Sequence, residues 1–251
     1  MLLEGKNAVI YGAGGSIGGA VARTFAREGA RVHLAGRTRE KLDQVAKQIR
    51  AAGGLADAAQ LDALDEQAVD DHADAIAKQA GSLDISFNLI SHGYVQGTPM
   101  AEMALDDYLG PLLSTVRSTF LTWRAAARNM VRQRSGVILA FGGEGPPPRG
   151  YHLGALQTAL HAVEAMRRQL ASELGTHGVR VVTVRTGGVP ETIPSGLPGR
   201  ERIAAGIERA TLLGRAATLE DVGAVAAFVA SDRARTMTAA TVNVSSGTLI
   251  D

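Results

Sequence analysis

The chain has 251 residues, of which 45% are apolar and 20% are charged. Its 26 basic and 25 acidic residues leave a net charge of +1, so no charge excess favours nucleic acid or an anionic membrane as a partner. The chain has no cysteine, which excludes disulfides, thiolate nucleophiles and cysteine-ligated metal sites. Neither a signal peptide nor a run of about 18 apolar residues is found, so we expect a cytoplasmic protein.

Short apolar runs alternate with helical patterns along almost the whole chain. In chain order, the first half predicts strand Asn7–Tyr11, helix Ile17–Glu28, strand Arg31–Ala35, helix Arg39–Ala52, strand Leu55–Leu61, helix Asp65–Gln79, strand Leu83–Ile90 and helix Leu105–Arg134. The second half predicts strand Gly136–Phe141, helix Leu153–Leu174, strand Val179–Arg185, loop Thr186–Pro198, helix Glu201–Arg209, helix Thr218–Ala230 with Thr218 as its N-cap, and strand Thr241–Val244.

This alternation predicts right-handed βαβ crossovers. We therefore expect a Rossmann-type, doubly wound α/β fold with a mostly parallel, seven-stranded sheet and helices on both faces. One domain over residues 1–251 is the simplest organisation, with a loop over residues 186–210 that covers the substrate.

A glycine cluster follows the first predicted strand and opens the first predicted helix. Glycines at this place allow a tight turn and let backbone approach a pyrophosphate, and the helix N-terminus favours the anion. Ile17 takes the place of the third glycine of the strict G-x-G-x-x-G pattern, but the strand–loop–helix context is the expected one. We predict that a dinucleotide binds to Gly12, Gly14, Gly15, Ser16, Ile17 and Gly18.

The end of the second predicted strand indicates which dinucleotide binds. NAD-binding folds of this type place an acidic residue here, about 20 residues after the glycines. This chain instead has Gly36-Arg37-Thr38, without an acid. The Arg37 guanidinium can form charge-assisted hydrogen bonds with a 2′-phosphate. The sequence therefore predicts NADP(H) in preference to NAD(H), with Arg37 and Thr38 as cofactor-binding residues.

With these motifs the chain resembles the short-chain dehydrogenase/reductase family over nearly its full length. Tyr11–Gly18 is similar to the family's T-G-x-x-x-G-x-G loop, with Ser16 in place of the middle glycine. Further similarities lie at Asp62-Ala63, at Asn88–Ser91, at Thr186-Gly187 and in the C-terminal pattern from Leu213 to Gly247. The resemblance implies that the cofactor site also includes Asp62, Ala63, Asn88, Ile90, Thr186, Gly187 and Val189.

The resemblance also implies a catalytic Asn, Ser and Y-x-x-x-K motif, in which tyrosine acts as general acid/base and lysine lowers its pKa. Counting back without gaps from Leu170–Val181 places these four positions at Thr115, Gly143, Leu156 and Leu160. None of the four has the family's residue. No Y-x-x-x-K occurs anywhere in the chain, and no lysine follows Lys78.

Several polar residues are candidates for the missing acid/base. Tyr151 and His152 precede the helix that should carry the tyrosine, and His92 and Tyr94 follow the fourth predicted strand. Further candidates, Glu144 and Arg149, lie in a proline-rich loop. The leucines at 156 and 160 either pack in an oligomer interface or line an apolar pocket. We expect no metal site, because the acidic run Asp70–Asp74 is best interpreted as a solvated helix face.

Two functions remain open. The first is an NADP(H)-dependent oxidoreductase with an altered mechanism that acts on a small molecule, for example by reducing a conjugated double bond. The second is an NADP(H)-binding sensor or assembly subunit without turnover. The family resemblance also implies a homotetramer or dimer built from the two long helices, Leu105–Arg134 and Leu153–Leu174.

Overall fold

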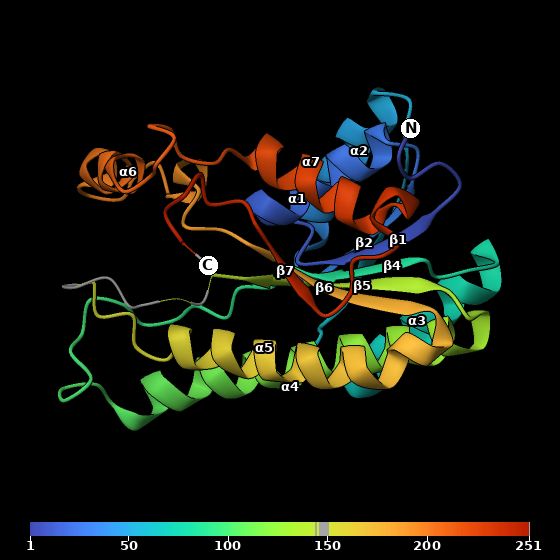
Figure 1. Cartoon of the computed structure of the whole chain (residues 1–251), viewed down its shortest axis with the longest axis horizontal. Coiled ribbons are helices and arrows are strands. Elements are labelled where there is room, and N and C mark those ends of the chain that lie inside the picture. Colours follow the sequence, from blue (N-terminus) through green and yellow to red (C-terminus); the bar gives the residue numbers. More distant parts are fainter. Residues whose placement is uncertain (144, 146–150, 251) are drawn as a thin grey trace.

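A computed structural model of the chain describes residues 1–143, 145 and 151–250. In this part of the chain, seven parallel strands form one sheet in the order β3-β2-β1-β4-β5-β6-β7 (Figure 1). The strands are β1 (Asn7–Tyr11), β2 (Arg31–Gly36), β3 (Leu55–Gln60), β4 (Ile85–Asn88), β5 (Gly136–Gly142), β6 (Val179–Arg185) and β7 (Ala240–Asn243). The order reverses between β1 and β4, as in a doubly wound sheet.

Helices cover both faces of the sheet (Figure 1). One face carries α1 (Ser16–Arg27), α2 (Arg39–Ala51) and α7 (Leu219–Ala230), and the other carries α3 (Glu66–Ala80), α4 (Leu105–Gln133) and α5 (Leu156–Leu174). The short helix α6 (Arg200–Arg209) and the one-turn helices η1 (Gly175–His177), η2 (Pro190–Thr192) and η3 (Asp232–Ala234) lie in connections. The predicted Rossmann-type fold is confirmed.

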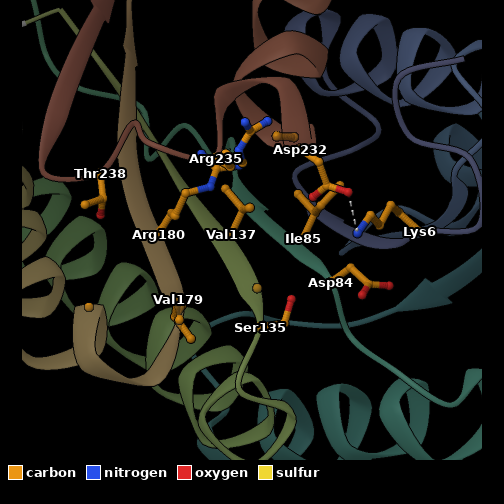
Figure 2. Close-up of a pocket in the computed structure, with 14 residues that line it drawn as sticks. Lys6, Asp84, Ile85, Ser135, Val137, Val179, Arg180, Asp232, Arg235 and Thr238 are labelled. Atoms are coloured by element: carbon orange, nitrogen blue, oxygen red, sulfur yellow. Dashed lines mark ion pairs between the residues drawn. The ribbon is translucent and has the colours of Figure 1, made fainter.

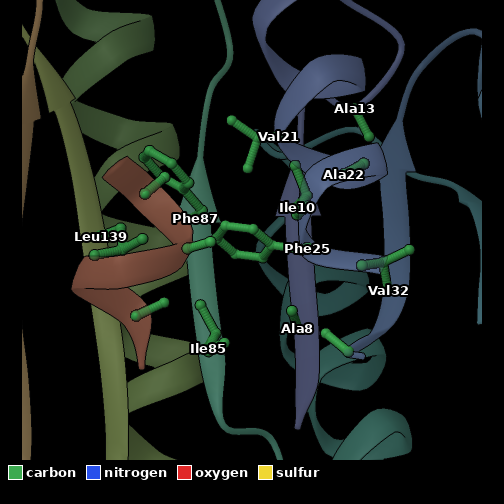
Figure 3. Close-up of a cluster of buried hydrophobic side chains, with 14 of the residues drawn as sticks. Ala8, Ile10, Ala13, Val21, Ala22, Phe25, Val32, Ile85, Phe87 and Leu139 are labelled. Carbon is green, nitrogen blue, oxygen red and sulfur yellow. The ribbon is translucent and has the colours of Figure 1, made fainter. Parts of the chain in front are cut away.

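Successive residues of each central strand face opposite layers, so both layers receive apolar side chains. In β1, Ala8 and Ile10 join the core under α1 and α7, whereas Val9 and Tyr11 join the core under α3 to α5. Figure 3 shows the first of these cores, with Phe25 of α1 between the strands that carry Ile10 and Phe87. Burial on both faces explains why the strands read as continuous apolar runs.

Two predicted elements have boundaries that were wrong by two residues or more, for local reasons. The fourth strand was expected at Leu83–Ile90, but β4 is shorter, because side chains take the backbone amides at both ends. Leu83 donates its N–H to Gln133 Oε1 at 2.8 Å, and Ile90 donates to Asn88 Oδ1 at 3.0 Å. Helix α5 was expected to begin at Leu153 but begins at Leu156, because Gly154 has a left-handed φ of +56°.

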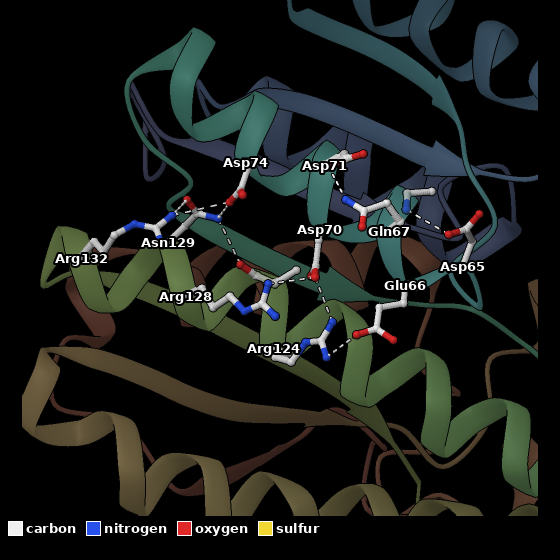
Figure 4. Close-up of polar contacts among 12 residues, drawn as sticks. Asp65, Glu66, Gln67, Asp70, Asp71, Asp74, Arg124, Arg128, Asn129 and Arg132 are labelled. Carbon is white, nitrogen blue, oxygen red and sulfur yellow. Dashed lines mark hydrogen bonds and ion pairs between the residues drawn. The ribbon is translucent and has the colours of Figure 1, made fainter.

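The acidic run on α3 was also interpreted wrongly in part. Asp74 is 60% exposed, as on a solvated face, but the side chain of Asp70 is only 16% exposed, because it meets cations of α4 (Figure 4). Asp70 Oδ2 accepts hydrogen bonds from Arg124 at 2.9 Å and from Arg128 at 2.8 Å, and Asp74 accepts one from Asn129 at 2.8 Å. The sequence pattern of one helix does not show which neighbour packs against it.

Candidate cofactor and substrate site

The predicted cofactor residues lie together at the carboxyl edge of the sheet. They occupy the segments that leave five parallel strands, and the carboxyl ends of parallel strands share one edge. After β1 come Gly12, Gly14, Gly15, Ser16, Ile17 and Gly18; after β2, Arg37 and Thr38; after β3, Asp62 and Ala63; at and after β4, Asn88 and Ile90; and after β6, Thr186, Gly187 and Val189.

The N-terminus of α1 is open towards this edge. Its N-cap, Gly15, makes no side-chain hydrogen bond, and the first turn contains no acidic residue. Backbone hydrogen bonding into the helix begins with the N–H of Gly19, which donates to the carbonyl of Gly15 at 2.8 Å. The N–H groups of Ser16, Ile17 and Gly18 precede that bond and head the helix. Together with the helix dipole they form a site for an anion.

Two glycines of the loop are required by close backbone contacts. Gly12 has a left-handed φ of +77°, and a β-carbon there would lie 2.7 Å from the carbonyl oxygen of Leu89. A β-carbon on Gly18 would overlap the carbonyl oxygen of Gly12. Gly15, in contrast, has an ordinary φ of −84° and is exposed, and a β-carbon there would lie 3.3 Å from the carbonyl oxygen of Gly12, so a side chain requires only a small shift.

Arg37 and Asp62 lie on neighbouring segments beside His92. Arg37 is exposed after β2, and its carbonyl accepts a hydrogen bond from Gln60 at 3.1 Å. Burial lowers the pKa of His92, the positive charge of Arg37 lowers it further, and the negative charge of Asp62 opposes both. The charges of Arg37 and Asp62 therefore both act on the His92 side chain. Thr38 is the N-cap residue of α2.

Helix α4 holds the segment after β4 through hydroxyl groups that the sequence analysis did not identify. Thr122 Oγ1 accepts a hydrogen bond from Asn88 Nδ2 at 3.2 Å, and Ser118 Oγ pairs with His92 Nε2 at 2.9 Å. Both hydroxyls are buried. Their spacing of four residues places them on one face of the helix, which is the signal that could have revealed them.

The segment after β6 closes the other side of the edge. Thr186 donates its N–H to the carbonyl of Gly142 at 3.1 Å, and Val189 is buried. A β-carbon on Gly187 would lie 2.6 Å from Cβ of Thr248, so the turn packs against the end of the chain. Gly188 faces Ile207 of α6 in the same way.

The four positions aligned with the family's catalytic residues gather near the start of α5. Thr115 is buried on α4, Leu156 begins α5 and Leu160 follows one turn later. A β-carbon on Gly143 would lie 4.0 Å from Cδ1 of Leu160 and 3.0 Å from the carbonyl oxygen of Thr186. The two leucines are partly buried, so apolar side chains line this region.

The candidate acid/base residues fall in different surroundings. Tyr151 is 47% exposed, and its hydroxyl lies 3.5 Å from the place of a β-carbon on Gly206 of α6. His152 is exposed, and its carbonyl accepts a hydrogen bond from Gly97 at 2.9 Å. Tyr94 is half-buried, and its hydroxyl is hydrogen-bonded to Thr115 Oγ1. Glu144 and Arg149 lie outside the described residues.

This arrangement fits a dinucleotide. The open end of α1 would hold the pyrophosphate, the groups around Arg37 and Asp62 the adenosine half, and the segments at Asn88–Ile90 and Thr186–Val189 the second nucleotide half. A nicotinamide cofactor supplies a hydride when it is bound. The residues at the start of α5 would then contact the hydride acceptor.

A pocket of about 260 Å³ lies at the opposite, amino edge of the sheet (Figure 2). Two of the cations that line it, Lys6 and Arg180, have partners within the fold. Lys6 pairs with Asp232 at 3.5 Å, and Arg180 donates to the carbonyls of Met237 and Ser231, each at 3.1 Å. Because this pocket lies at the amino edge, it is remote from the residues that fit a cofactor, which lie at the carboxyl edge. Among the described residues, no helix combines the length and apolarity needed to cross a bilayer.

Comparisons with known proteins agree with the fold and the glycine loop. A family model described as enoyl-(acyl carrier protein) reductase matches residues 12–248. The chain is 31% identical to an uncharacterized oxidoreductase of Methylorubrum extorquens, with 98% of each chain covered. It is 28% identical to D-threitol dehydrogenase of Mycolicibacterium smegmatis, with 98% of this chain and 93% of that protein covered.

Among solved structures, a short-chain type dehydrogenase/reductase from Mycobacterium marinum superposes with a TM-score of 0.86 at 27% identity, and 99% of this chain and 97% of that chain are covered. Sheet, glycine loop and these matches together define a nucleotide-binding oxidoreductase fold. The chain belongs to the short-chain dehydrogenase/reductase family. Membership of this family implies an NAD(P) cofactor.

Proposed function

We propose that this protein is an NADP(H)-dependent oxidoreductase that acts on a small molecule through polar residues other than a Y-x-x-x-K motif. The observation that carries the proposal is the uncapped N-terminus of α1, behind a loop in which Gly12 and Gly18 allow no side chain. Such an end binds a phosphate anion through free N–H groups and the helix dipole. It lies at the carboxyl edge of the sheet, where this class of fold binds its ligands.

The preference for NADP(H) rests on Arg37. Its side chain is exposed after β2, and within the described part of the chain it forms no ion pair. The neighbouring Arg39, in contrast, forms two hydrogen bonds with Asp43, at 3.0 and 2.9 Å. Arg37 is therefore available for the 2′-phosphate, whereas Arg39 is already paired.

Replacing Arg37 tests this preference. Fluorescence titration of Arg37→Ala should show NADPH affinity reduced at least tenfold, with NADH affinity changed less than twofold, because only NADPH carries the 2′-phosphate. Arg39→Ala is the matched control and should leave both affinities unchanged. Equal dissociation constants of the wild-type protein for NADPH and NADH would contradict the role of Arg37.

The substrate side supports a reaction other than simple ketone reduction. Leu156 and Leu160 cannot transfer a proton, and they occupy the positions that the family alignment gives to tyrosine and lysine. We propose that the segment over residues 186–210, which includes η2 and α6, covers the substrate. Its contact with Tyr151 at Gly206 is consistent with this role.

The same two leucines favour a second function, a cofactor-dependent sensor or assembly subunit without turnover. Titration with NADPH, followed by a screen of saturated carbonyls and enones for NADPH consumption, separates the two. Binding with consumption supports the oxidoreductase, and binding without consumption over the whole panel supports the sensor. If no nucleotide binds, both are wrong.

We further propose self-association through α4. Leu105, Leu113 and Phe120 of this helix are 69%, 61% and 53% exposed, which is unusual for large apolar side chains on one helix. Light scattering coupled to size-exclusion chromatography should give a mass of two or four chains. Phe120→Glu should shift that mass towards the monomer.

A further inference from the structure

We propose that Tyr94 is the catalytic hydrogen-bond donor of this protein, that Thr115 positions it, and that the substrate is an α,β-unsaturated carbonyl compound. This inference rests on the proposed oxidoreductase function. It assigns to a loop residue the role of the family's catalytic tyrosine, because the aligned position of that tyrosine is Leu156.

The Tyr94 hydroxyl has a defined direction. It is hydrogen-bonded to Thr115 Oγ1 on α4. The single hydroxyl proton of Thr115 is donated to the carbonyl of Pro111 at 2.8 Å, so Thr115 accepts and Tyr94 donates. Thr115 is only 9% exposed, which fixes its rotamer within α4. A buried threonine therefore holds the phenol O–H in place.

The loop that carries Tyr94 is fixed against the residues that precede α5. Gly97 donates its N–H to the carbonyl of His152 at 2.9 Å. A β-carbon on Gly154 would lie 2.6 Å from the carbonyl oxygen of Val95, so the two backbones are in direct contact. Tyr94 is the residue before Val95, and it therefore lies between α4 and the first turn of α5, where Leu156 stands.

Burial of this phenol determines which proton chemistry it can perform, and apolar side chains stand on the neighbouring segments. Leu156 and Leu160 are partly buried on α5, and the side chain of Met103 lies against Gly154. Burial raises the pKa of Tyr94, and the hydrogen bond with Thr115 lowers it by less. The phenol thus stays protonated near neutral pH and acts as a hydrogen-bond donor rather than as a strong acid.

A donor of this kind suits conjugate reduction. NADPH held at the glycine loop would supply a hydride for the β-carbon of the unsaturated carbonyl and would become NADP⁺, while the C=C electron pair would move to form an enolate. The Tyr94 O–H donates to the enolate oxygen, and a proton from water adds to the α-carbon. As the phenol turns to the substrate, the Thr115 hydroxyl can turn from Pro111 and donate to the phenol oxygen. Reduction of a simple ketone would instead need a full proton at the oxygen.

The test compares Tyr94→Phe with Tyr108→Phe, because the second removes a hydroxyl that is likewise hydrogen-bonded to a threonine, Thr158 at 2.8 Å, but has no role in the proposed site. NADPH binding is measured first by fluorescence titration, and reduction of 2-cyclohexenone and cyclohexanone is then followed as NADPH consumption. Absorbance titration with 4-nitrophenolate on the NADP⁺ complex reports directly on the oxyanion site. Tyr94→Phe should keep NADPH affinity, lose at least tenfold in enone reduction and bind 4-nitrophenolate at least tenfold more weakly. Tyr108→Phe should match the wild type.

The variant Thr115→Val tests whether Thr115 positions the Tyr94 hydroxyl or only contributes to the fold. Thr115→Val removes the hydroxyl that can turn to donate to the phenolate, a hydrogen bond that lowers the pKa of Tyr94. The ionisation of Tyr94, followed by ultraviolet absorbance with Tyr94→Phe as the reference, should therefore move to higher pH, and Thr115→Ser should restore it. Failure of the wild type to bind NADPH would overturn the proposed function itself. If NADPH binds but Tyr94→Phe retains wild-type affinity for 4-nitrophenolate, the assignment of Tyr94 is wrong while the proposed function stands. The same conclusion follows if the wild type reduces an enone and Tyr94→Phe reduces it at the same rate.

Discussion

Helices α1 and α7 pack side by side on one face of the sheet and contain 12 residues each, but their N-termini differ (Figure 1). Helix α7 begins with a capping box. Thr218 Oγ1 accepts the N–H of Asp221 at 3.1 Å, and Asp221 Oδ2 accepts the N–H of Thr218 at 3.0 Å. Helix α1 begins with Gly15, which has no side chain to cap it. A cap stabilises a helix by about 1 kcal/mol. The difference supports our proposal that the end of α1 is kept open for an external anion.

The largest expected effect comes from closing the loop sterically. Gly18→Ala places a β-carbon against the carbonyl oxygen of Gly12, so the first turn of α1 must move. We expect the free energy of unfolding to fall by about 3 kcal/mol, as for overpacking of a core, and NADPH binding to be undetectable. Chemical denaturation and fluorescence titration measure the two effects.

Gly110→Ala in α4 is the control, because a β-carbon there meets no atom within 4 Å. It should leave NADPH affinity unchanged. Wild-type NADPH affinity in Gly18→Ala would contradict the role of the loop.

The next effect is a loss of stability in acid. Variants at the two helix ends should therefore be compared above the pH at which this loss begins. Burial and the nearby His33 lower the pKa of His72 to about 4, against 6.5 for the ordinary side chain. Below pH 6.5 the unfolded chain binds a proton that the folded chain does not, so stability falls as the pH falls from 6.5 towards 4. The shift corresponds to about 3 kcal/mol, at 1.36 kcal/mol for each pKa unit.

Urea denaturation between pH 7.5 and pH 4 measures this loss. His72→Leu should flatten the profile, whereas His161→Gln, on an exposed position of α5, should retain the wild-type slope. An unchanged slope in His72→Leu would show that other groups cause the acid sensitivity.

A smaller effect is expected from giving α1 the cap that α7 already has. Gly15→Asp introduces an acceptor for the free N–H groups and a negative charge at the helix end. The backbone at Gly15 is already extended, with φ −84° and ψ 169°, as an N-cap requires. NADPH affinity should fall at least tenfold, while the melting temperature of the cofactor-free protein should stay equal or rise.

Gly15→Asn is the matched control, because it caps the helix without a charge. Its loss of NADPH affinity should be smaller than that of Gly15→Asp. If both variants bind NADPH as tightly as the wild type, the pyrophosphate does not lie at this end.

The smallest effect is expected from removing the cap of α7. Thr218→Ala should lower the free energy of unfolding by about 1 kcal/mol, and NADPH affinity should not change. Thr218→Ser should retain the wild-type stability in denaturant titrations. A loss of cofactor affinity in Thr218→Ala would contradict the claim that only the N-terminus of α1 serves cofactor binding.

Patterns within one segment allowed most of the fold to be predicted. The alternation of apolar runs with helical spacing gave all seven strands, and Thr218 was identified as an N-cap from its place before a helical run. The glycine loop was identifiable because its position between strand and helix is a local property.

Features that depend on contacts between distant segments were not predictable in this way. The ion pairs of Asp70 with α4, and the hydroxyls of Ser118 and Thr122 behind the cofactor segment, join residues 26 to 58 positions apart. Tyr94 was one candidate among several from sequence alone. Its partial burial and its contact with Thr115 distinguish it from Tyr151, and both depend on how the loop after β4 packs on α4.

The most direct test of an open end on α1 is nuclear magnetic resonance of the backbone amides during NADPH titration. We expect the amide signals of Ser16, Ile17 and Gly18 to shift strongly, while those of Glu220 and Asp221 at the capped end of α7 stay in place. Saturable NADPH binding without shifts at Ser16–Gly18 would contradict the account.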